Sequence, residues 1–185
     1  MLSLYADGDP QPGALAIAHR AGVSERTVYR YFDDLESLAA TAIEHQWARG
    51  GHLFAPPPNR GNRRTRISAL VDQRLRIHDA FGPFARAAAL LASSSPTVAR
   101  IVALRRRVLR EQTVAHLERE IDRRRGSRRG ELVDALDAAT SLEHVEYLRV
   151  SLGRSRRRAR GVMIESVAAL LALPSRTSSP PAAVR

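Results

Sequence analysis

Apolar residues recur at three- and four-residue steps along most of this 185-residue chain. Such a period places apolar side chains on one face of an α-helix, whereas a half-buried strand alternates apolar and polar residues. No segment of the chain shows a convincing two-residue alternation. The spacing therefore predicts an all-α protein.

Glycine and proline residues divide the pattern into two parts. Their densest group lies at residues 50–62, and such groups mark loops. We interpret this segment as a linker between two domains. The other predicted units are an N-terminal domain at residues 1–49, a larger helical domain at residues 63–174, and a flexible, Ser/Pro/Ala-rich tail at residues 175–185.

Helix-breaking glycine and proline residues also divide the larger domain into helical stretches. Gly82 and Pro83 are expected to end one helix and to open the next, and Gly153 is placed to cap a helix at its C-terminus. The predicted order is a helix ending near residue 82, a short helix at 83–92, the longest helix at 96–122, a solvated loop at 123–130, and apolar stripes at 131–152 and 154–173.

All 30 basic residues are arginine, against 19 acidic residues, which gives a formal net charge of +11. The first fifty residues hold four arginines and seven acids, so the excess lies in the second part of the chain. Its clusters, at residues 105–107, 123–129 and 154–160, are interpreted as solvated faces or loops, with general attraction to phosphate as the alternative. Arg105 to Arg107 advance by about 100° each and should wrap around a helix.

Several kinds of protein are disfavoured by what the sequence lacks. There is no cysteine, which excludes disulfides, thiolate zinc sites and cysteine nucleophiles. The six histidines form no metal-binding spacing, and there is no phosphate-binding glycine loop or GxSxG motif. The longest apolar run, at residues 167–173, is too short to span a bilayer, and the N-terminus does not resemble a signal peptide. We expect a cytoplasmic protein that is not an enzyme and needs no metal or cofactor.

The most informative segment is GALAIAHRAGVSERTVYRYF, residues 13–32. Gly22 can end a first short helix in a left-handed turn, and Ser24 can cap a second one. Val23 and Val28 occupy the positions of a hydrophobic staple. Two short helices joined by a glycine turn are typical of a helix-turn-helix, whose second helix enters the major groove of DNA.

This segment, followed by DDLESL, resembles the DNA-binding region of TetR-family (TetR/AcrR-like) transcriptional regulators. The matching residues are Ile17, Ala18, Ala21, Gly22, Val23, Ser24, Tyr29, Phe32, Glu36 and Leu38. The match covers about 40 residues. The resemblance implies a ligand-responsive repressor, in which an N-terminal head binds a palindromic operator on double-stranded DNA. A helical C-terminal domain would form a homodimer and bind a small-molecule effector.

The resemblance also implies roles for the second helix of the motif. Arginine is the best reader of guanine because its guanidinium matches O6 and N7 together, and threonine can contact a thymine methyl or a phosphate. The residues implied near base edges are Glu25, Arg26, Thr27, Arg30 and Tyr31, and those implied on phosphates are Ser24 and Tyr29.

The chain departs from the family pattern in three places. Leu35 stands where the family has the lysine of FxxK, so a phosphate contact is missing there. Gly13 stands near the Ser or Thr that usually opens the first helix of the motif. The family's first helix is represented only by residues 2–6, so either the true start lies upstream of Met1, which we favour, or this head lacks part of its core.

Histidines and aromatic residues in the larger domain are candidates for a ligand pocket between helices, and ordinary core packing is the alternative. The candidates are His78, Phe81, Phe84, His144 and Tyr147. Trp47 is placed to pack the N-terminal domain against the larger one. The stripes within residues 131–173 have the lengths to form a four-helix bundle with a second copy, or to bury each other within one chain.

A second function from another class fits the same composition. The chain would then be a helical interaction protein with a degenerate DNA-binding head. Its arginine-rich second half would bind RNA, an acidic partner or an anionic surface.

Overall fold

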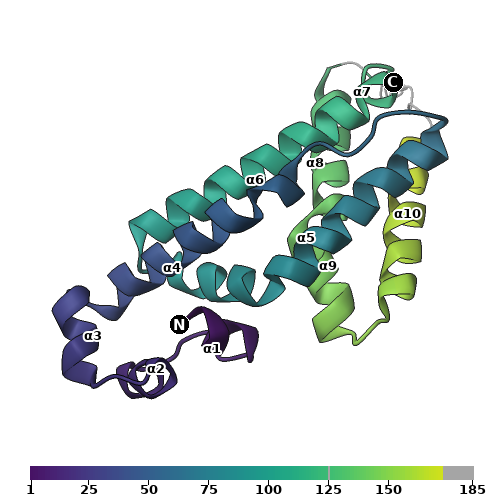
Figure 1. Cartoon of the computed structure of the whole chain (residues 1–185). Helices are drawn as coiled ribbons and strands as arrows, with labels where there is room; N and C mark the ends of the chain where they lie inside the picture. The colour runs from purple at the N-terminus through teal and green to yellow at the C-terminus, as the bar shows by residue number, and fades with distance from the viewer. Residues whose placement is uncertain (125, 173–185) are drawn as a thin grey trace, which may run out of the picture.

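In the computed structural model, which describes residues 1–124 and 126–172, every regular element is helical. The prediction of an all-α protein is confirmed for these residues. The elements, shown in Figure 1, are α1 (Leu2–Ala6), α2 (Ala14–Ala21), α3 (Glu25–Tyr31), α4 (Leu35–Gly50), the 3₁₀ turn η1 (Gly51–Phe54), α5 (Arg63–Leu91), α6 (Pro96–His116), α7 (Glu118–Ile121), α8 (Ser127–Thr140), α9 (Leu142–Glu146), the π turn η2 (Tyr147–Ser151) and α10 (Arg156–Ala172). None of these helices combines the length and the apolar content needed to cross a bilayer. The predicted tail at residues 175–185 lies outside the described residues.

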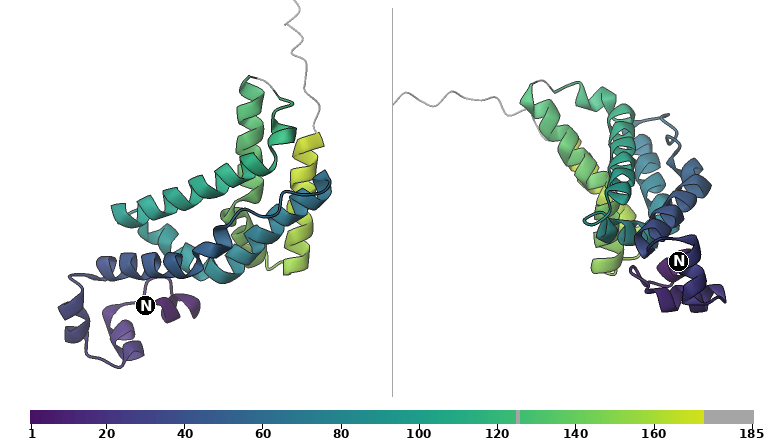
Figure 2. Two further views of the ribbon diagram at one scale, coloured as in Figure 1. Left: turned by 45° about the horizontal axis from the view of Figure 1, so that its top comes forward. Right: turned by 90° about the vertical axis from the view of Figure 1, so that its left-hand side faces the viewer.

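The first three helices and the start of α4 surround a small apolar core, which we call the N-terminal cluster. Leu4, Ile17 and Val28 are buried in it, and Leu35 and Leu38 of α4 pack against them. Figures 1 and 2 show α2 and α3 at one end of the molecule, away from the long helices. The cluster therefore fixes α3 at this end while leaving most of its surface to solvent.

Helix α4 runs from the N-terminal cluster to the long helices and contacts both. Ile43 packs into an apolar cluster formed by α5 and α6. Farther along, the ring of Trp47 lies 4.4 Å from that of Phe54. Gly50 lies so close to Phe81 that a Cβ atom would overlap the ring. The C-terminal half of α4 is thus packed tightly against the larger part of the molecule.

The segment interpreted as a linker, residues 50–62, begins with an ordered turn. Phe54 of η1 is buried, and its ring lies 5.5 Å from that of Phe81. The carbonyl of Ala55 accepts a hydrogen bond from Nε2 of Gln73 on α5 at 2.6 Å. These contacts hold the first residues of the segment against α5.

Helix α5 is central to the larger part of the molecule and packs against α6, α9 and α10. Leu70, Val71 and Leu75 are fully buried in a cluster that also holds Leu136 of α8 and Met163 of α10. Complete burial of such a side chain contributes about 1.5–3 kcal/mol. The repeats at three- and four-residue steps therefore point into one shared core.

The helix break expected at Gly82 and Pro83 is wrong, because α5 continues from residue 63 to residue 91 with Pro83 inside it. Figure 1 shows that α5 bends along its length, as proline in a helix commonly causes. A Cβ at Gly82 would lie 3.3 Å from Nε2 of His78, so the glycine leaves space for this imidazole. Phe81 and Ala87, on either side of the proline, are both buried, and this packing outweighs the lost hydrogen bond.

Helix α6 ends earlier than predicted for residues 96–122. It stops at His116, and α7 follows after Leu117. The imidazole Nε2 of His116 lies 2.8 Å from the carbonyl oxygen of Arg66 on α5, and Leu117 is fully buried. These contacts with distant parts of the chain accompany the turn. Helix α5, with 29 residues against 21 for α6, is the longest helix of the described part.

Two further boundaries differ from the prediction. The expected loop at 123–130 is shorter, because Gly126 takes a left-handed φ of 63° and α8 begins at the next residue. The stripe at 131–152 is divided at Ser141, whose hydroxyl accepts a hydrogen bond from the backbone at the start of α9. Gly153 has a φ of 60°, which confirms the glycine turn predicted there.

Several arginines lie in the core. Arg66, Arg74 and Arg105 are buried. Along α6, Arg105 is buried, Arg106 binds Glu143 at 2.9 Å, and Arg107 is exposed. The prediction that residues 105–107 wrap the helix is confirmed, whereas the assignment of the whole cluster to a solvated face is wrong for Arg105.

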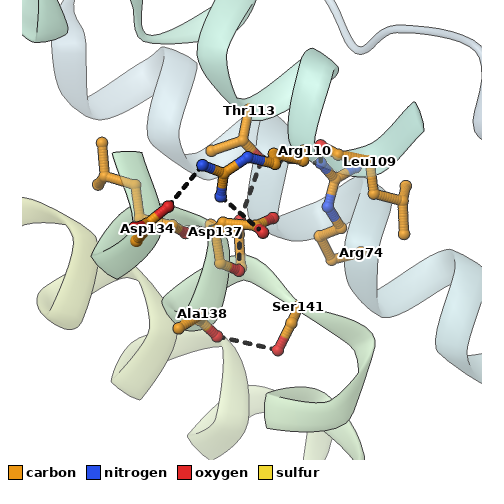
Figure 3. A network of polar contacts seen from close by, with 10 residues as sticks. Arg74, Leu109, Arg110, Thr113, Asp134, Asp137, Ala138 and Ser141 are labelled. Carbon is orange, nitrogen blue, oxygen red and sulfur yellow. Dashed lines mark hydrogen bonds and ion pairs between the residues drawn. The ribbon is translucent and has the colours of Figure 1, made fainter. Parts of the chain in front are cut away.

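A polar network joins α5, α6 and α8 (Figure 3). Arg74 of α5 donates from Nη2 to the carbonyl of Leu109 at 2.8 Å and to Oγ1 of Thr113 at 3.1 Å. On the other side of α6, the guanidinium of Arg110 reaches Asp137 of α8 at 3.1 Å and also binds Asp134. Polar contacts of Arg74 and Arg110 therefore join α5 to α6 and α6 to α8, in addition to the apolar contacts between these helices.

Acid should destabilise the protein through His116. Burial, followed by the charges of Arg66 and Arg74, lowers the pKa of His116, although its hydrogen bond to the Arg66 carbonyl partly opposes this shift. Below the unfolded-state pKa of about 6.5, the unfolded chain binds the proton more readily. The free energy of unfolding should therefore be maintained above this pH and fall as pH drops through the folded-state pKa.

Urea unfolding at about pH 7.5 and about pH 5.5 tests this contribution. We expect His116→Gln to flatten the difference between the two conditions, and His52→Gln, at an exposed position, to leave it unchanged. Equal pH dependence in His116→Gln and in the parent chain would contradict the assignment.

Candidate functional site

Helices α2 and α3 are joined by a tight turn. Gly22 has a φ of 68°, and the backbone N–H of Val23 donates to the carbonyl of Ala18 at 3.0 Å. The hydroxyl of Ser24 accepts a hydrogen bond from the backbone N–H of Thr27 at 3.2 Å. The predicted glycine turn and serine cap are both confirmed.

The two residues expected to form a hydrophobic staple differ in burial. Val23 remains 42% exposed and lies outside the N-terminal cluster. Val28 is buried, and its partners there include Leu4 and Ile17. The apolar contact of Val28 with α1 and α2 therefore anchors α3.

Most side chains of α3 face solvent. Tyr29 is 49% and Tyr31 70% exposed, and Glu25, Arg26 and Arg30 are exposed as well. Nη2 of Arg30 donates to the hydroxyl of Tyr31 at 3.3 Å, and its guanidinium lies 5.0 Å from the centre of the tyrosine ring. This contact restrains two flexible side chains on an exposed helix face.

Two of the residues expected to contact DNA are already engaged with each other. Oγ of Ser24 lies 3.0 Å from Oγ1 of Thr27, in addition to capping α3. Arg26, in contrast, has no ion-pair partner among the described residues. It is the exposed cation of this helix whose side chain makes no hydrogen bond within the described part of the chain, since Arg30 binds the hydroxyl of Tyr31.

The departure at Leu35 has a structural counterpart. This residue begins α4, and its side chain packs against the N-terminal cluster. The preceding residue, Asp34, caps α4 by accepting a hydrogen bond from the backbone N–H of Ser37 at 2.7 Å. At this position the chain therefore gains an apolar contact where the family has a cation.

A cavity lies between α5, α6 and the α9–η2 segment, with a volume of about 210 Å³. Of the residues expected to line a ligand pocket, His78 and Tyr147 line this cavity. Phe81 and Phe84 instead line a neighbouring space of about 30 Å³ next to Trp47. His144 lines neither of them. The structure thus brings two of the five candidates together at one cavity.

Charged residues that the sequence pattern did not single out form much of the cavity wall. Nε2 of His78 lies 2.7 Å from a carboxylate oxygen of Glu146, and Nη1 of Arg86 donates to the same carboxylate at 2.9 Å. Nη2 of Arg105 donates to Glu143 at 3.2 Å. His78 and Arg86 are eight residues apart on one helical face, but the break predicted at Gly82 and Pro83 concealed this relation.

The cavity environment shifts two ionisation equilibria. Burial lowers the pKa of Arg105, and the charge of Glu143 opposes that shift. For Glu143, burial alone would raise the pKa, but hydrogen bonds from its own backbone and from Arg106, with the charge of Arg105, lower it. Both groups are therefore charged at neutral pH.

The stripes proposed for dimerisation do pack against each other within the chain. Ala159, Met163 and Val167 of α10 are buried in a cluster shared with α5 and α8. On the outer side of α10, Gly161, Glu165 and Ala169 remain exposed. One face of this helix is thus used inside the chain, and another remains accessible.

The arginines of the second part serve two purposes. Many bind acidic side chains across helices, as Arg160 of α10 binds Asp72 of α5 at 2.7 Å. Others are exposed and have no ion-pair partner among the described residues; these are Arg60, Arg63, Arg76, Arg100, Arg107, Arg119, Arg123, Arg154, Arg157 and Arg158. The net positive charge therefore remains only partly neutralised at the surface.

Comparisons of the chain with models of protein families, with curated proteins and with solved structures find no match.

Proposed function

We propose that the protein is a sequence-specific DNA-binding transcriptional regulator that acts as a ligand-responsive repressor. The observation that supports this function best is the exposed face of α3. Val28 anchors the helix, while Arg26, Arg30 and Tyr31 face solvent. In a helix-turn-helix, the second helix presents such side chains to base edges in the major groove. Glu25 and Thr27 are assigned to the same groove, and Ser24 and Tyr29 to phosphates.

As a homodimer, the protein would present two α3 helices to the two halves of a palindromic operator. Two recognition helices about 34–36 Å apart reach successive major grooves on one side of a palindromic site. The accessible face of α10, with Gly161 and Ala169, supports close approach by the same helix of a second copy. We therefore keep residues 131–173 as the proposed dimer interface, and the cytoplasm as the expected compartment.

The ligand response is proposed to pass from the larger domain to the head through α4. Trp47 and Gly50 of α4 pack against Phe54 and Phe81, close to the proposed effector cavity. An effector that favours one arrangement of these contacts would change operator affinity, and operator DNA would change effector affinity by the same factor. The role is one of binding, without a catalytic step.

Replacing Arg26 by alanine should weaken specific DNA binding by about 10- to 100-fold, because a bidentate arginine–guanine contact is worth about 1–3 kcal/mol of discrimination. Arg26 is exposed, so folding should be unaffected. The measurement is a gel shift with duplexes selected by the parent protein from a random library. Arg76→Ala, at an exposed arginine of α5, is the matched control and should keep full affinity.

Two results would contradict this proposal. Unchanged affinity of Arg26→Ala for the selected duplex would show that Arg26 does not contact the bases. Failure to select any sequence, with binding to all duplexes that disappears equally as salt rises, would favour the helical interaction protein with an arginine-rich second half.

A further inference from the structure

We propose that the 210 Å³ cavity between α5, α6 and the α9–η2 segment binds a small monocarboxylate with an apolar ring or short chain. This ligand class deepens the proposed function, because it would define the effector. Three observations support the binding site independently of DNA binding: the cavity, its charged residues and its apolar wall.

The charges at the cavity leave one positive charge in excess. Arg105 and Arg106 both bind the single carboxylate of Glu143, through the same oxygen. At the other side, Arg86 and Glu146 neutralise each other. If Arg105 turns to a ligand, Arg106 still neutralises Glu143. An incoming carboxylate therefore need not leave a protein carboxylate without a partner.

Two buried nitrogen atoms at the same wall lack hydrogen-bond partners among the described residues. Nε of Arg105 and Nδ1 of His78 are buried and have no hydrogen-bond partner. Both residues are more than nine-tenths buried, and both line the cavity. A buried polar atom without a partner costs about 1–3 kcal/mol, so a small shift that brings Nε of Arg105 onto the carboxylate of a ligand would be favourable.

The rest of the wall suits an apolar body of limited size. Gly82, Ala85 and Ala89 present small surfaces along α5, and Leu142 and Tyr147 face them from the other side. The volume of about 210 Å³ corresponds to on the order of seven water molecules in the liquid. A ring or short chain would fill it, with the charged end toward Arg105.

The two glutamates distinguish among anions. Glu143 and Glu146 both line the cavity, so a dianionic phosphate would bring two charges against two carboxylates with only one spare arginine. A monocarboxylate matches that single charge. Bidentate pairing with guanidinium also suits the planar carboxylate.

The test is a ligand-observed NMR titration of the full chain with benzoate and hexanoate, each compared with its neutral amide, and with benzylamine as the cation. We expect at least one carboxylate to bind about tenfold more tightly than its amide, as a charge-assisted pair worth about 1.4 kcal/mol requires. Benzylamine should not bind. If neither acid binds better than its amide, the proposal is wrong.

Variants locate the site. Arg105→Gln should abolish the preference for the acid over the amide, and Arg105→Lys should restore part of it. Arg107→Gln, two residues along the same helix and exposed, should leave the preference unchanged. If Arg105→Gln does not fold, Arg106→Gln serves in its place. Its side chain is 60% exposed, and its removal should lower carboxylate affinity several-fold, because Glu143 would then retain Arg105.

Equal loss in Arg105→Gln and Arg107→Gln, or no effect in Arg106→Gln, would place carboxylate binding elsewhere and overturn the proposal. The titration contains no DNA. A protein that binds carboxylates but no operator would contradict the proposed function alone, and one that binds operator but no carboxylate would contradict this inference alone.

Discussion

Replacing Arg74 by alanine is expected to lower the free energy of unfolding by about 3–5 kcal/mol. Arg74 is fully buried, and burial lowers its pKa to about 10, so it remains charged at neutral pH. Its guanidinium donates to the carbonyl of Leu109, to Thr113 and to the side-chain oxygens of Gln73 and Gln112. Alanine would leave Oε1 of Gln73 without its donor, remove one of the hydrogen bonds at Leu109, Thr113 and Gln112, and create a cavity between α5 and α6.

Urea unfolding followed by circular dichroism measures this loss. Arg74→Met fills much of the volume and removes the buried charge, so it should be less destabilising than Arg74→Ala. Arg76→Ala, at an exposed position two residues along α5, should change stability by no more than about 0.5 kcal/mol. A loss in Arg74→Ala no larger than in Arg76→Ala would show that the network adds nothing to stability.

Removing the carboxylate of Glu120 should cost a similar amount, about 3–5 kcal/mol. Glu120 of α7 forms a buried ion pair with Arg66 of α5, and the exposed fractions of the two residues are 9% and 4%. In Glu120→Ala, Arg66 would remain charged and buried without its partner. The cost comes mainly from this uncompensated charge, since an intact buried pair returns little net stability.

A double-mutant cycle separates these contributions. We expect Arg66→Met combined with Glu120→Leu to recover most of the stability lost in Glu120→Ala, because no charge then remains buried. The cycle is completed by the unfolding free energies of Arg66→Met, of Glu120→Leu and of the double variant that combines them. Strictly additive losses would mean that the two residues do not interact in the folded protein.

The sequence predicts the parts of this fold that depend on local signals. The left-handed turn at Gly22 and the cap at Ser24 depend on residues within one or two turns of helix, so both could be read directly. The same holds for the turn at Gly153. Local conformational preferences act there without competition from the rest of the chain.

Contacts between distant residues explain the differences. Arg66 and Glu120 are 54 positions apart, and Arg160 and Asp72 are 88 apart, so no short pattern reveals which arginines are paired or buried. Arginine is usually exposed, so a solvated face is predicted for the cluster at residues 105–107, and this prediction is wrong for Arg105. At Pro83, the packing of both halves of α5 overrides a strong helix-breaking preference.

The residues of the cavity include one that a local sequence pattern indicates and others that only contacts between distant residues bring together. His78 was identified because a histidine near aromatic residues is a recognisable pattern, whereas Arg86 and Arg105 resembled ordinary surface arginines. Glu146 became a partner of His78 only through a contact across 68 positions. Had α5 been predicted as continuous, the common face of His78, Gly82 and Arg86 would have pointed to this wall.

The packing of α4 has a mechanical consequence. The helix has 16 residues, which corresponds to a rod of about 24 Å. Trp47 and Gly50 fix one end of the rod, and Leu35 lies at the other, in the N-terminal cluster. Because Ile43 also packs against α5 and α6, a tilt of about 10° about this residue would displace Leu35 by about 2 Å, more than half of the 3.4 Å rise of one base pair. If α3 binds DNA as proposed, a side-chain adjustment around Phe81 that tilts α4 would shift α3 along the base pairs by a distance of this order.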